Sequence, residues 1–241
     1  MIDLPILTTL GIVALAALIH ASFQLGVSVL TLLSGHSLSR KRSQFRVFRL
    51  TTSFVSGVAT MSLLILSFFA LFLGYISTDD NHILLWSIIS GLLIGVGIAV
   101  WIFYYRPGEG TRLWLPRGIA SFLTDRTKAT KRSAEAFSLG TTTVLGELPF
   151  LIAPLAVSAY ALIHLPTTWQ VVGIALYVII SMSSLGVVWM LVGGGHKLSA
   201  IQAWREKHKM FLQFIAAAGL LVLGAYTFVN EALVASAGAA L

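Results

Sequence analysis

The sequence contains no cysteine in its 241 residues. This excludes disulfide bonds, thiolate metal ligands and cysteine-based redox chemistry. Charged residues are also scarce, at 10% of the chain, where a soluble domain has about a quarter. With 57% hydrophobic residues and a mean hydropathy of +0.89, the chain needs lipid as its solvent. The composition therefore predicts an integral membrane protein with one transmembrane domain, residues 1–241.

Signatures of common enzyme classes are missing as well. The sequence has no Gly-x-Ser-x-Gly nucleophile motif, no His-Glu-x-x-His metal motif and no Walker A phosphate loop. We therefore expect neither an enzyme nor a resident cofactor, and no motif identifies a metal.

Six apolar runs are each long enough to cross a bilayer, whose core of about 30 Å takes about 20 helical residues. The first run exceeds one crossing, and Gly26 within it is a candidate break. The sequence therefore predicts an all-α bundle of six transmembrane helices. The expected spans are Leu4–Leu33, Leu50–Gly74, Ile83–Tyr105, Ser138–Ile163, Trp169–Val192 and Met210–Val229.

Lysine and arginine are confined to three connections between these runs. All 16 lie within residues 40–49, 106–132 and 197–209. Because cytoplasmic loops retain Lys and Arg, we expect these connections in the cytoplasm and both termini on the other side of the cell membrane. The net charge of +7 and pI near 10 then indicate contact with anionic lipid headgroups rather than with nucleic acid.

The central basic connection, residues 106–137, divides the chain into halves 1–105 and 138–241. Within it, Pro116 suits a first helical position, and Phe122 and Leu123 belong to an apolar set at helical spacing. This pattern predicts an amphipathic helix at the membrane surface. It is either a linker lying on headgroups or an element that gates the protein or docks a partner.

The two halves share a short internal similarity. Ser90–Gly97 in the third run and Ala218–Gly224 in the sixth both read small-Gly-Leu-Leu-β-branched, followed by Gly. Since these runs cross the membrane in opposite directions, a true repeat is inverted, a 3+3 construction common in secondary transporters. The alternative is chance similarity, with glycines that permit close helix packing.

Glu147 is the outstanding ionisable residue within an expected span. It lies about ten residues into the fourth run, near mid-depth. A carboxylate there costs several kcal/mol unless it is paired, protonated or hydrated, so such residues usually line cavities, ion paths or proton relays. We predict a coupling acid or cation ligand, with Thr143 one turn earlier; a protonated packing group is the alternative. Gly146, Pro149 and Pro154 predict a break in the same helix.

His20 has a similar expected depth in the first run. Gln24, four residues later, shares its helix face. We predict that both join Glu147 in a site that holds a cation or carries a proton, because buried His and Glu can titrate near neutral pH. For His20, helix packing is the alternative.

Two further histidines, His36 and His196, each follow glycine at an expected cytoplasmic helix end. They could form a cytoplasmic gate or a pair of metal ligands. The alternative is C-terminal capping, in which glycine ends the helix and the helix dipole favours a cation.

One family resemblance rests on Leu145–Pro154, which reads Leu-Gly-Glu-Leu-Pro-Phe-Leu-Ile-Ala-Pro. This segment resembles the Gly-x-x-Pro-Cys-x-x-Pro type segment of CcdA-type transmembrane conduits, and Ala218–Tyr226 is similar to their last helix. With the six-helix layout, the chain resembles the lysine-exporter (LysE-type) superfamily, which implies an inverted-repeat fold and transport. Phe150 stands where the conduits have cysteine, so a thiol relay is excluded. The first run also lacks the Pro-Gly-Pro of amino-acid exporters, so an amino-acid substrate is not implied.

The sequence thus favours a small secondary transporter or exporter of a small solute or cation, with a midplane site at Glu147. The alternative is a non-transporting membrane module that binds a protein or lipid partner through its basic loops. Either protein could be an oligomer.

Overall fold

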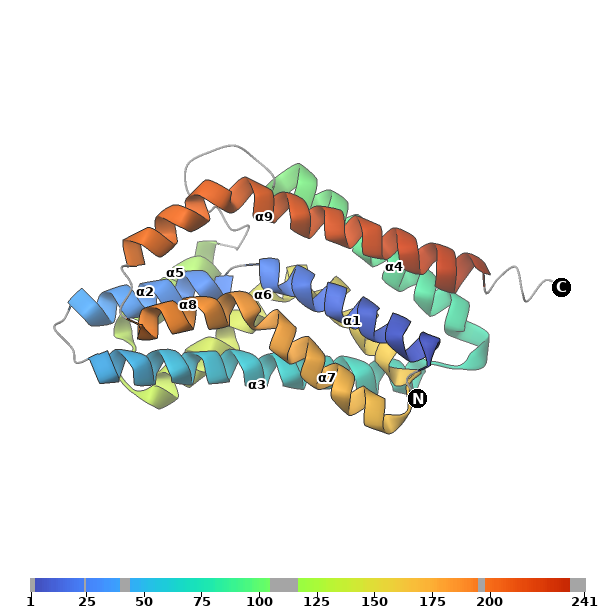
Figure 1. The fold of residues 1–241 in the computed structure, drawn as a ribbon, viewed down its shortest axis with the longest axis horizontal. Coiled ribbons are helices and arrows are strands. Elements are labelled where there is room, and N and C mark those ends of the chain that lie inside the picture. Colours follow the sequence, from blue (N-terminus) through green and yellow to red (C-terminus); the bar gives the residue numbers. More distant parts are fainter. Residues whose placement is uncertain (1–2, 24, 40–43, 105–116, 195–197, 235–241) are drawn as a thin grey trace.

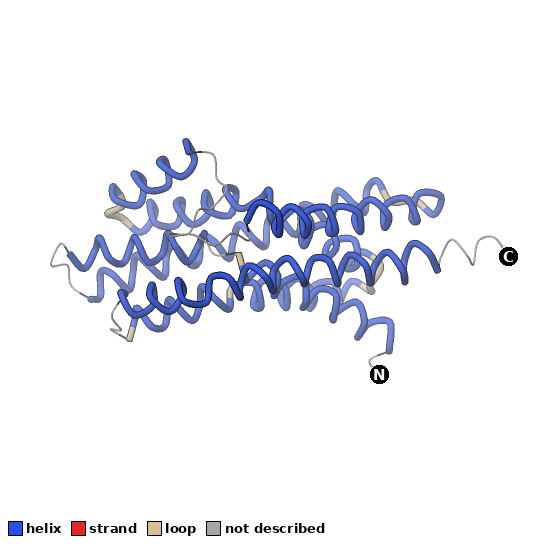
Figure 2. Tube along the Cα trace, turned by 90° about the horizontal axis from the view of Figure 1, so that it is seen from above, coloured by secondary structure: helices blue, strands red, loops and turns tan. Residues whose placement is uncertain are grey.

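The computed structural model describes residues 3–23, 25–39, 44–104, 117–194 and 198–234. Every regular element in these ranges is helical, and the helices form one elongated bundle (Figures 1 and 2). The fold is therefore all-α, as the sequence predicts. The elements are α1 (Leu4–Ser22), α2 (Leu25–Ser39), α3 (Gln44–Ile76), η1 (Asp79–Asn81), α4 (His82–Ala99), η2 (Val100–Tyr104), α5 (Arg117–Ala129), α6 (Ser133–Ile163), α7 (Thr167–Ser181), α8 (Ser183–Gly193), α9 (Leu198–Thr227) and η3 (Phe228–Leu233).

The bundle has the helix lengths of a multi-pass membrane protein. In the described ranges, five helices are long and apolar enough to cross a bilayer, and there are six if α7 and α8, bent by 51°, count as one span. Helix α1 begins and η3 ends at the same end of the bundle (Figure 1), which fits an even number of crossings.

Several helices begin before their apolar runs. Helix α3 begins at Gln44 instead of Leu50, and α9 begins at Leu198 instead of Met210. These extra turns lie in the basic segments. Hydropathy does not indicate where a helix begins there, because a helix outside the bilayer need not be apolar. The central connection contains α5, while Pro116 lies outside the described residues.

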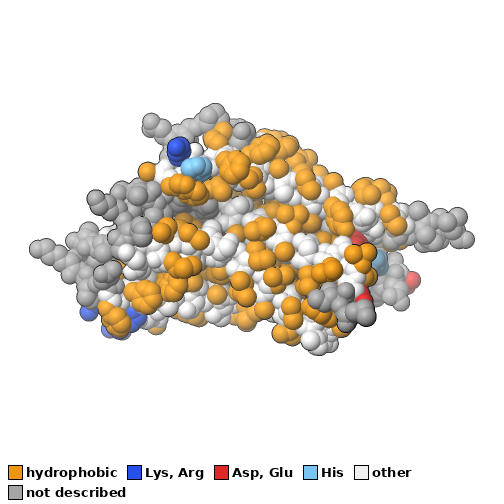
Figure 3. Space-filling view, viewed as in Figure 1, with side chains coloured by type: hydrophobic (Ala, Val, Ile, Leu, Met, Phe, Trp, Pro, Cys, Tyr) orange, Lys and Arg blue, Asp and Glu red, His pale blue; other side chains and the backbone are white. Residues whose placement is uncertain are grey.

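The sides of the bundle are apolar. On α3, Phe68, Leu71 and Tyr75 are 63%, 76% and 88% exposed. Hydrophobic side chains cover the middle of the visible face, with Lys and Arg near one end and Asp and Glu near the other (Figure 3). A soluble monomer rarely exposes so large an apolar surface, so lipid is its natural environment. We call the end with Arg46, Arg126 and Lys207 the basic end, and that with Asp80, His82 and Glu231 the acidic end.

Helices α3 and α6 pack side by side in the same direction. A Cβ atom on Gly57 would collide with the carbonyl oxygen of Phe137, and one on Gly140 would collide with that of Phe54. Because glycine has no side chain at these two positions, the two helix backbones can approach each other closely. Nearer the acidic end, the hydroxyls of Ser77 and Tyr160 lie 3.4 Å apart.

Helices α4 and α9 pack in opposite directions, again with a glycine on each. A Cβ atom on Gly97 would lie 3.0 Å from Leu221, and one on Gly224 would lie 2.8 Å from Ile94. The hydroxyls of Ser90 and Thr227 lie 2.9 Å apart across this interface. Each helix then ends in a π-helical segment, η2 after α4 and η3 after α9.

The helix breaks differ from the expected ones. The first span breaks at Phe23, whose backbone is extended (φ −77°, ψ 125°), and Gly26 lies in the first turn of α2. The fifth span bends at Met182, where the sequence analysis expected one continuous helix.

The break expected in the fourth span at Gly146, Pro149 and Pro154 does not occur, and that prediction is wrong as a description of this fold. Helix α6 is continuous from Ser133 to Ile163 with both prolines inside it. Each proline removes one backbone hydrogen bond and perturbs the helix locally. The contact with α3 along the length of α6 holds the turns on either side together.

Candidate functional site at the two helix breaks

The end of α1 at Phe23 lies beside the bend between α7 and α8 at Met182. Helix α1 contacts α7, and α2 contacts α8 (Figure 1). The pairs run in the same direction, because His20 contacts Tyr177 and the later Ala21 contacts the later Ser184. The middle of the bundle therefore contains two interruptions of regular helix next to each other.

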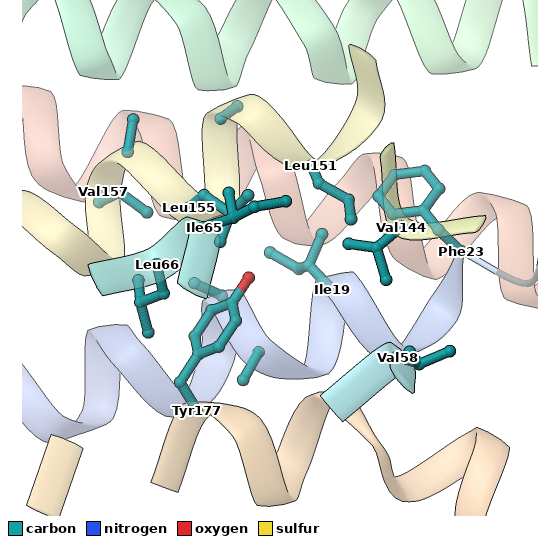
Figure 4. Packing of buried hydrophobic residues seen from close by; sticks show 14 of the residues in the cluster. Ile19, Phe23, Val58, Ile65, Leu66, Val144, Leu151, Leu155, Val157 and Tyr177 are labelled. Carbon is teal, nitrogen blue, oxygen red and sulfur yellow. The ribbon is translucent and has the colours of Figure 1, made fainter. Parts of the chain in front are cut away.

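His20 and Tyr177 form a buried polar pair beside these breaks. The Nδ1 atom of His20 lies 3.0 Å from the Tyr177 hydroxyl. Their exposed fractions are 3% and 0%. The Tyr177 side chain is directed from α7 toward α1 (Figure 4). Either group can donate, so a proton can be held on the imidazole or on the phenol side of this bond.

The end of α1 is capped by α8. The last carbonyls of a helix have no partner within that helix. Here the Ser184 hydroxyl donates to the carbonyl oxygen of Ala21 at 2.8 Å, and the backbone N–H of Phe23 donates to the carbonyl oxygen of His20 at 3.1 Å. The last turn of α1 is thus hydrogen-bonded both to Phe23 and to α8.

The start of α2 is bound by Glu147 of α6. The backbone N–H of Gly26 donates to Oε1 of Glu147 at 3.0 Å, and the backbone N–H of Leu25 also faces the carboxylate. These are N–H groups of a first helical turn, which lack partners within the helix and carry its positive dipole end. Glu147 is only 5% exposed. Its carboxylate therefore joins the middle of α6 to the break in the first span.

Helices α2 and α6, which form this contact, contain no Lys or Arg. The charge of an ionised Glu147 is met by backbone dipoles, which leaves the site able to accept a proton or a cation. In the described ranges, no group of three or more His, Asp or Glu side chains could hold a metal ion.

The expected site residues come only partly together. His20 and Glu147 lie on opposite sides of the break at Phe23, and in the described part of the chain each bonds to a different partner. Thr143 is fully buried one turn from Glu147, and its hydroxyl donates to the carbonyl oxygen of Leu139 in its own helix.

Three other expected residues cannot be placed in the site. Gln24 and His196 lie outside the described residues. His36 belongs to α2, but its side chain lies outside the described part. The predicted gate of His36 and His196 therefore stays a prediction.

Sequence reasoning missed Tyr177, Ser184 and the bend at Met182. A signal was present, because Ser181, Ser183 and Ser184 surround Met182 in the middle of an apolar run. Serine competes for backbone hydrogen bonds and bends helices in membranes.

Comparisons with protein-family models, with curated proteins and with solved structures find no match to this chain.

Proposed function

We propose that this chain is a small secondary transporter or exporter of a small solute or cation, with its site at the two helix breaks and Glu147 as the coupling acid. The observation that supports this most directly is the pairing of two broken spans beside a buried carboxylate. Irregular backbone at membrane depth is tolerated where protein buries it or where it lines a watery cavity. Transporters use such discontinuous helices to bind substrates and coupling ions.

Glu147 supplies a way to couple binding to movement. The backbone N–H of Gly26 donates to Oε1 of Glu147 at 3.0 Å, and a proton or cation that neutralises the carboxylate weakens this charge-assisted bond. Weakening that bond frees the start of α2 from α6. Because Phe23 is already non-helical, α2 can tilt without unwinding α1. The ligand shifts the equilibrium by its difference in affinity for the two arrangements.

The other polar groups complete the proposed site. His20 with Tyr177 provides a second proton-holding group next to the break. Gln24 and Thr143 are its proposed polar neighbours, and His36 and His196 its proposed cytoplasmic gate. The protein has no resident cofactor and is not an enzyme in this proposal.

The proposed topology places both termini outside the cell, the basic connections in the cytoplasm, and the two halves in an inverted 3+3 repeat. The opposite directions of α4 and α9, and their reciprocal contacts through Gly97 and Gly224, support equivalent roles for these two helices. The broken spans are the first and the fifth, which are not equivalent in such a repeat. Membership of the lysine-exporter superfamily is part of the same proposal.

Flux in proteoliposomes under an imposed pH gradient tests the function. Metal cations, organic cations, amino acids and small anions are offered in turn, with internal pH read in parallel. Glu147→Gln should abolish gradient-dependent flux, because it keeps an acceptor for Gly26 but cannot ionise. Glu231→Gln at the acidic end is the matched control and should transport normally. Equal flux in the wild type and Glu147→Gln would refute the role of this carboxylate.

The second candidate function is a membrane module that binds an acidic partner or anionic lipid. Helix α5 favours it: Phe122 is 47% exposed, and the Arg126 guanidinium lies 5.5 Å from the centre of its ring. Leu123 and Thr127 on the same helix are buried against the bundle. If Arg126→Gln with Lys128→Gln removed function while Glu147→Gln did not, the module would be the better description.

A further inference from the structure

A pair of histidines lies at the acidic end, away from the helix breaks. His82 is the first residue of α4, and His164 follows the last turn of α6. Their ring centres are 5.3 Å apart and their planes are perpendicular, at 86°. His164 is exposed and His82 is half-buried, so both imidazoles can be reached from water.

We propose that His82 and His164 together bind one divalent transition-metal ion of the Cu²⁺ or Zn²⁺ type. Metal–nitrogen bonds of about 2.1 Å at a tetrahedral angle place two coordinating rings about 5 Å apart, centre to centre. The observed separation is 5.3 Å. The distance between the ring centres is thus compatible with one shared metal ion.

The hydrogen bond of His164 prepares its other nitrogen for a metal. Its Nδ1 lies 2.7 Å from the carbonyl oxygen of Tyr160. A carbonyl only accepts, so Nδ1 carries a proton, and in a neutral imidazole Nε2 is then the nitrogen with the free lone pair. A backbone carbonyl on the far ring nitrogen is the usual support of a metal-binding histidine, since it fixes both tautomer and ring orientation.

The ring of Tyr160 packs against both imidazoles. Its ring centre lies 4.9 Å from that of His164 and 6.1 Å from that of His82. The ring is fully buried, packs edge-on against Trp86 at 4.9 Å, and has its hydroxyl 3.4 Å from that of Ser77. Both imidazoles therefore pack against the same buried ring.

The ligand set selects the class of metal. Imidazole nitrogen suits Cu²⁺ and Zn²⁺, whereas Ca²⁺ and Mg²⁺ require several oxygen ligands. Among the described residues, no third His, Asp or Glu completes the group. The ion would join the start of α4 to the end of α6. The proposal does not depend on transport.

Titration of the purified full-length protein with Cu²⁺ tests the site, with electron paramagnetic resonance to count nitrogen ligands. The wild type should bind one ion through two imidazole nitrogens, and excess Mg²⁺ should not compete. His82→Ala and His164→Ala should each weaken binding by about tenfold or more. His208→Ala is the matched control: His208 also bonds through Nδ1 to a backbone carbonyl, that of Trp204 at 2.8 Å, but at the basic end.

A second measurement needs no substitution. Zn²⁺ should protect His82 and His164 of the wild type from modification by diethylpyrocarbonate, read residue by residue by mass spectrometry, while His208 stays reactive. The proposal would be overturned if Zn²⁺ protected only one of the two histidines from modification. It would also be overturned if replacing both histidines left Cu²⁺ binding unchanged. An ion held by one nitrogen would overturn it as well, because a single surface histidine would then explain the binding.

Discussion

The contact between α3 and α6 allows a quantitative prediction from one methyl group. In Gly140→Ala, the new Cβ collides with the carbonyl oxygen of Phe54 and lies 3.0 Å from the backbone nitrogen of Val58. All these neighbours are backbone atoms of α3, so relief requires moving two whole helices apart. Overpacking typically costs about 1–3 kcal/mol, and the gain in helix propensity returns at most about 1 kcal/mol. Because no side chain can rotate away, we expect the upper range, a net loss of about 2 kcal/mol.

The matched control is Gly91→Ala in α4, where an added Cβ meets nothing within 4 Å. It should leave stability unchanged or raise it by up to about 1 kcal/mol. Reversible unfolding in mixed detergent–SDS micelles, followed by far-ultraviolet circular dichroism, measures both variants. If Gly140→Ala proved as stable as Gly91→Ala, the close approach of α3 and α6 at Gly140 would be incorrect.

Two further predictions concern the polar bonds at the helix breaks and use the same unfolding assay. Tyr177→Phe leaves the buried Nδ1 of His20 without its partner and should cost about 1–2 kcal/mol, whereas Tyr75→Phe, at a residue 88% exposed, should be neutral; equal effects would contradict the buried pair. Ser184→Ala removes the donor to the Ala21 carbonyl and should cost about 1 kcal/mol. Ser87→Ala, whose hydroxyl bonds to the Ile83 carbonyl of its own helix, should cost less, and the reverse order would argue against a cap between spans.

The positions of the spans could be predicted from the sequence because crossing a bilayer is a requirement on length and composition. Apolar runs located α3, α4, α6 and α9, and hydropathy alone carried that inference. The ends of these helices were harder to predict. A helix that leaves the bilayer continues into water at little cost, so α9 begins well before Met210 without any change that hydropathy records.

The breaks and polar pairs were mostly beyond sequence reasoning because they depend on contacts between distant segments. Glu147 was identified from its burial in an apolar run, but its partner is a backbone N–H of Gly26, a group that every residue except proline has. His20 was identified in the same way, while Tyr177 lies 157 positions away along the chain. Pro149 and Pro154 led to the wrong prediction of a break in α6. The expectation that proline breaks a helix considers one helix alone and not the packing of its neighbour against it.

The two π-helical segments have a consequence for how this chain tolerates changes in length. A π turn closes hydrogen bonds one residue further along than an α turn and so carries about one extra residue. Segments η2 and η3 follow the tight contact of α4 with α9 at opposite ends of the bundle. Loss of one residue there converts a π turn to an α turn and changes the phase only of what comes after it. The paired glycines Gly97 and Gly224 precede these segments and keep their register. A one-residue change in η2 or η3 is therefore expected to alter only the contacts that the segment itself makes with the facing helix, and to leave the glycine contacts in place.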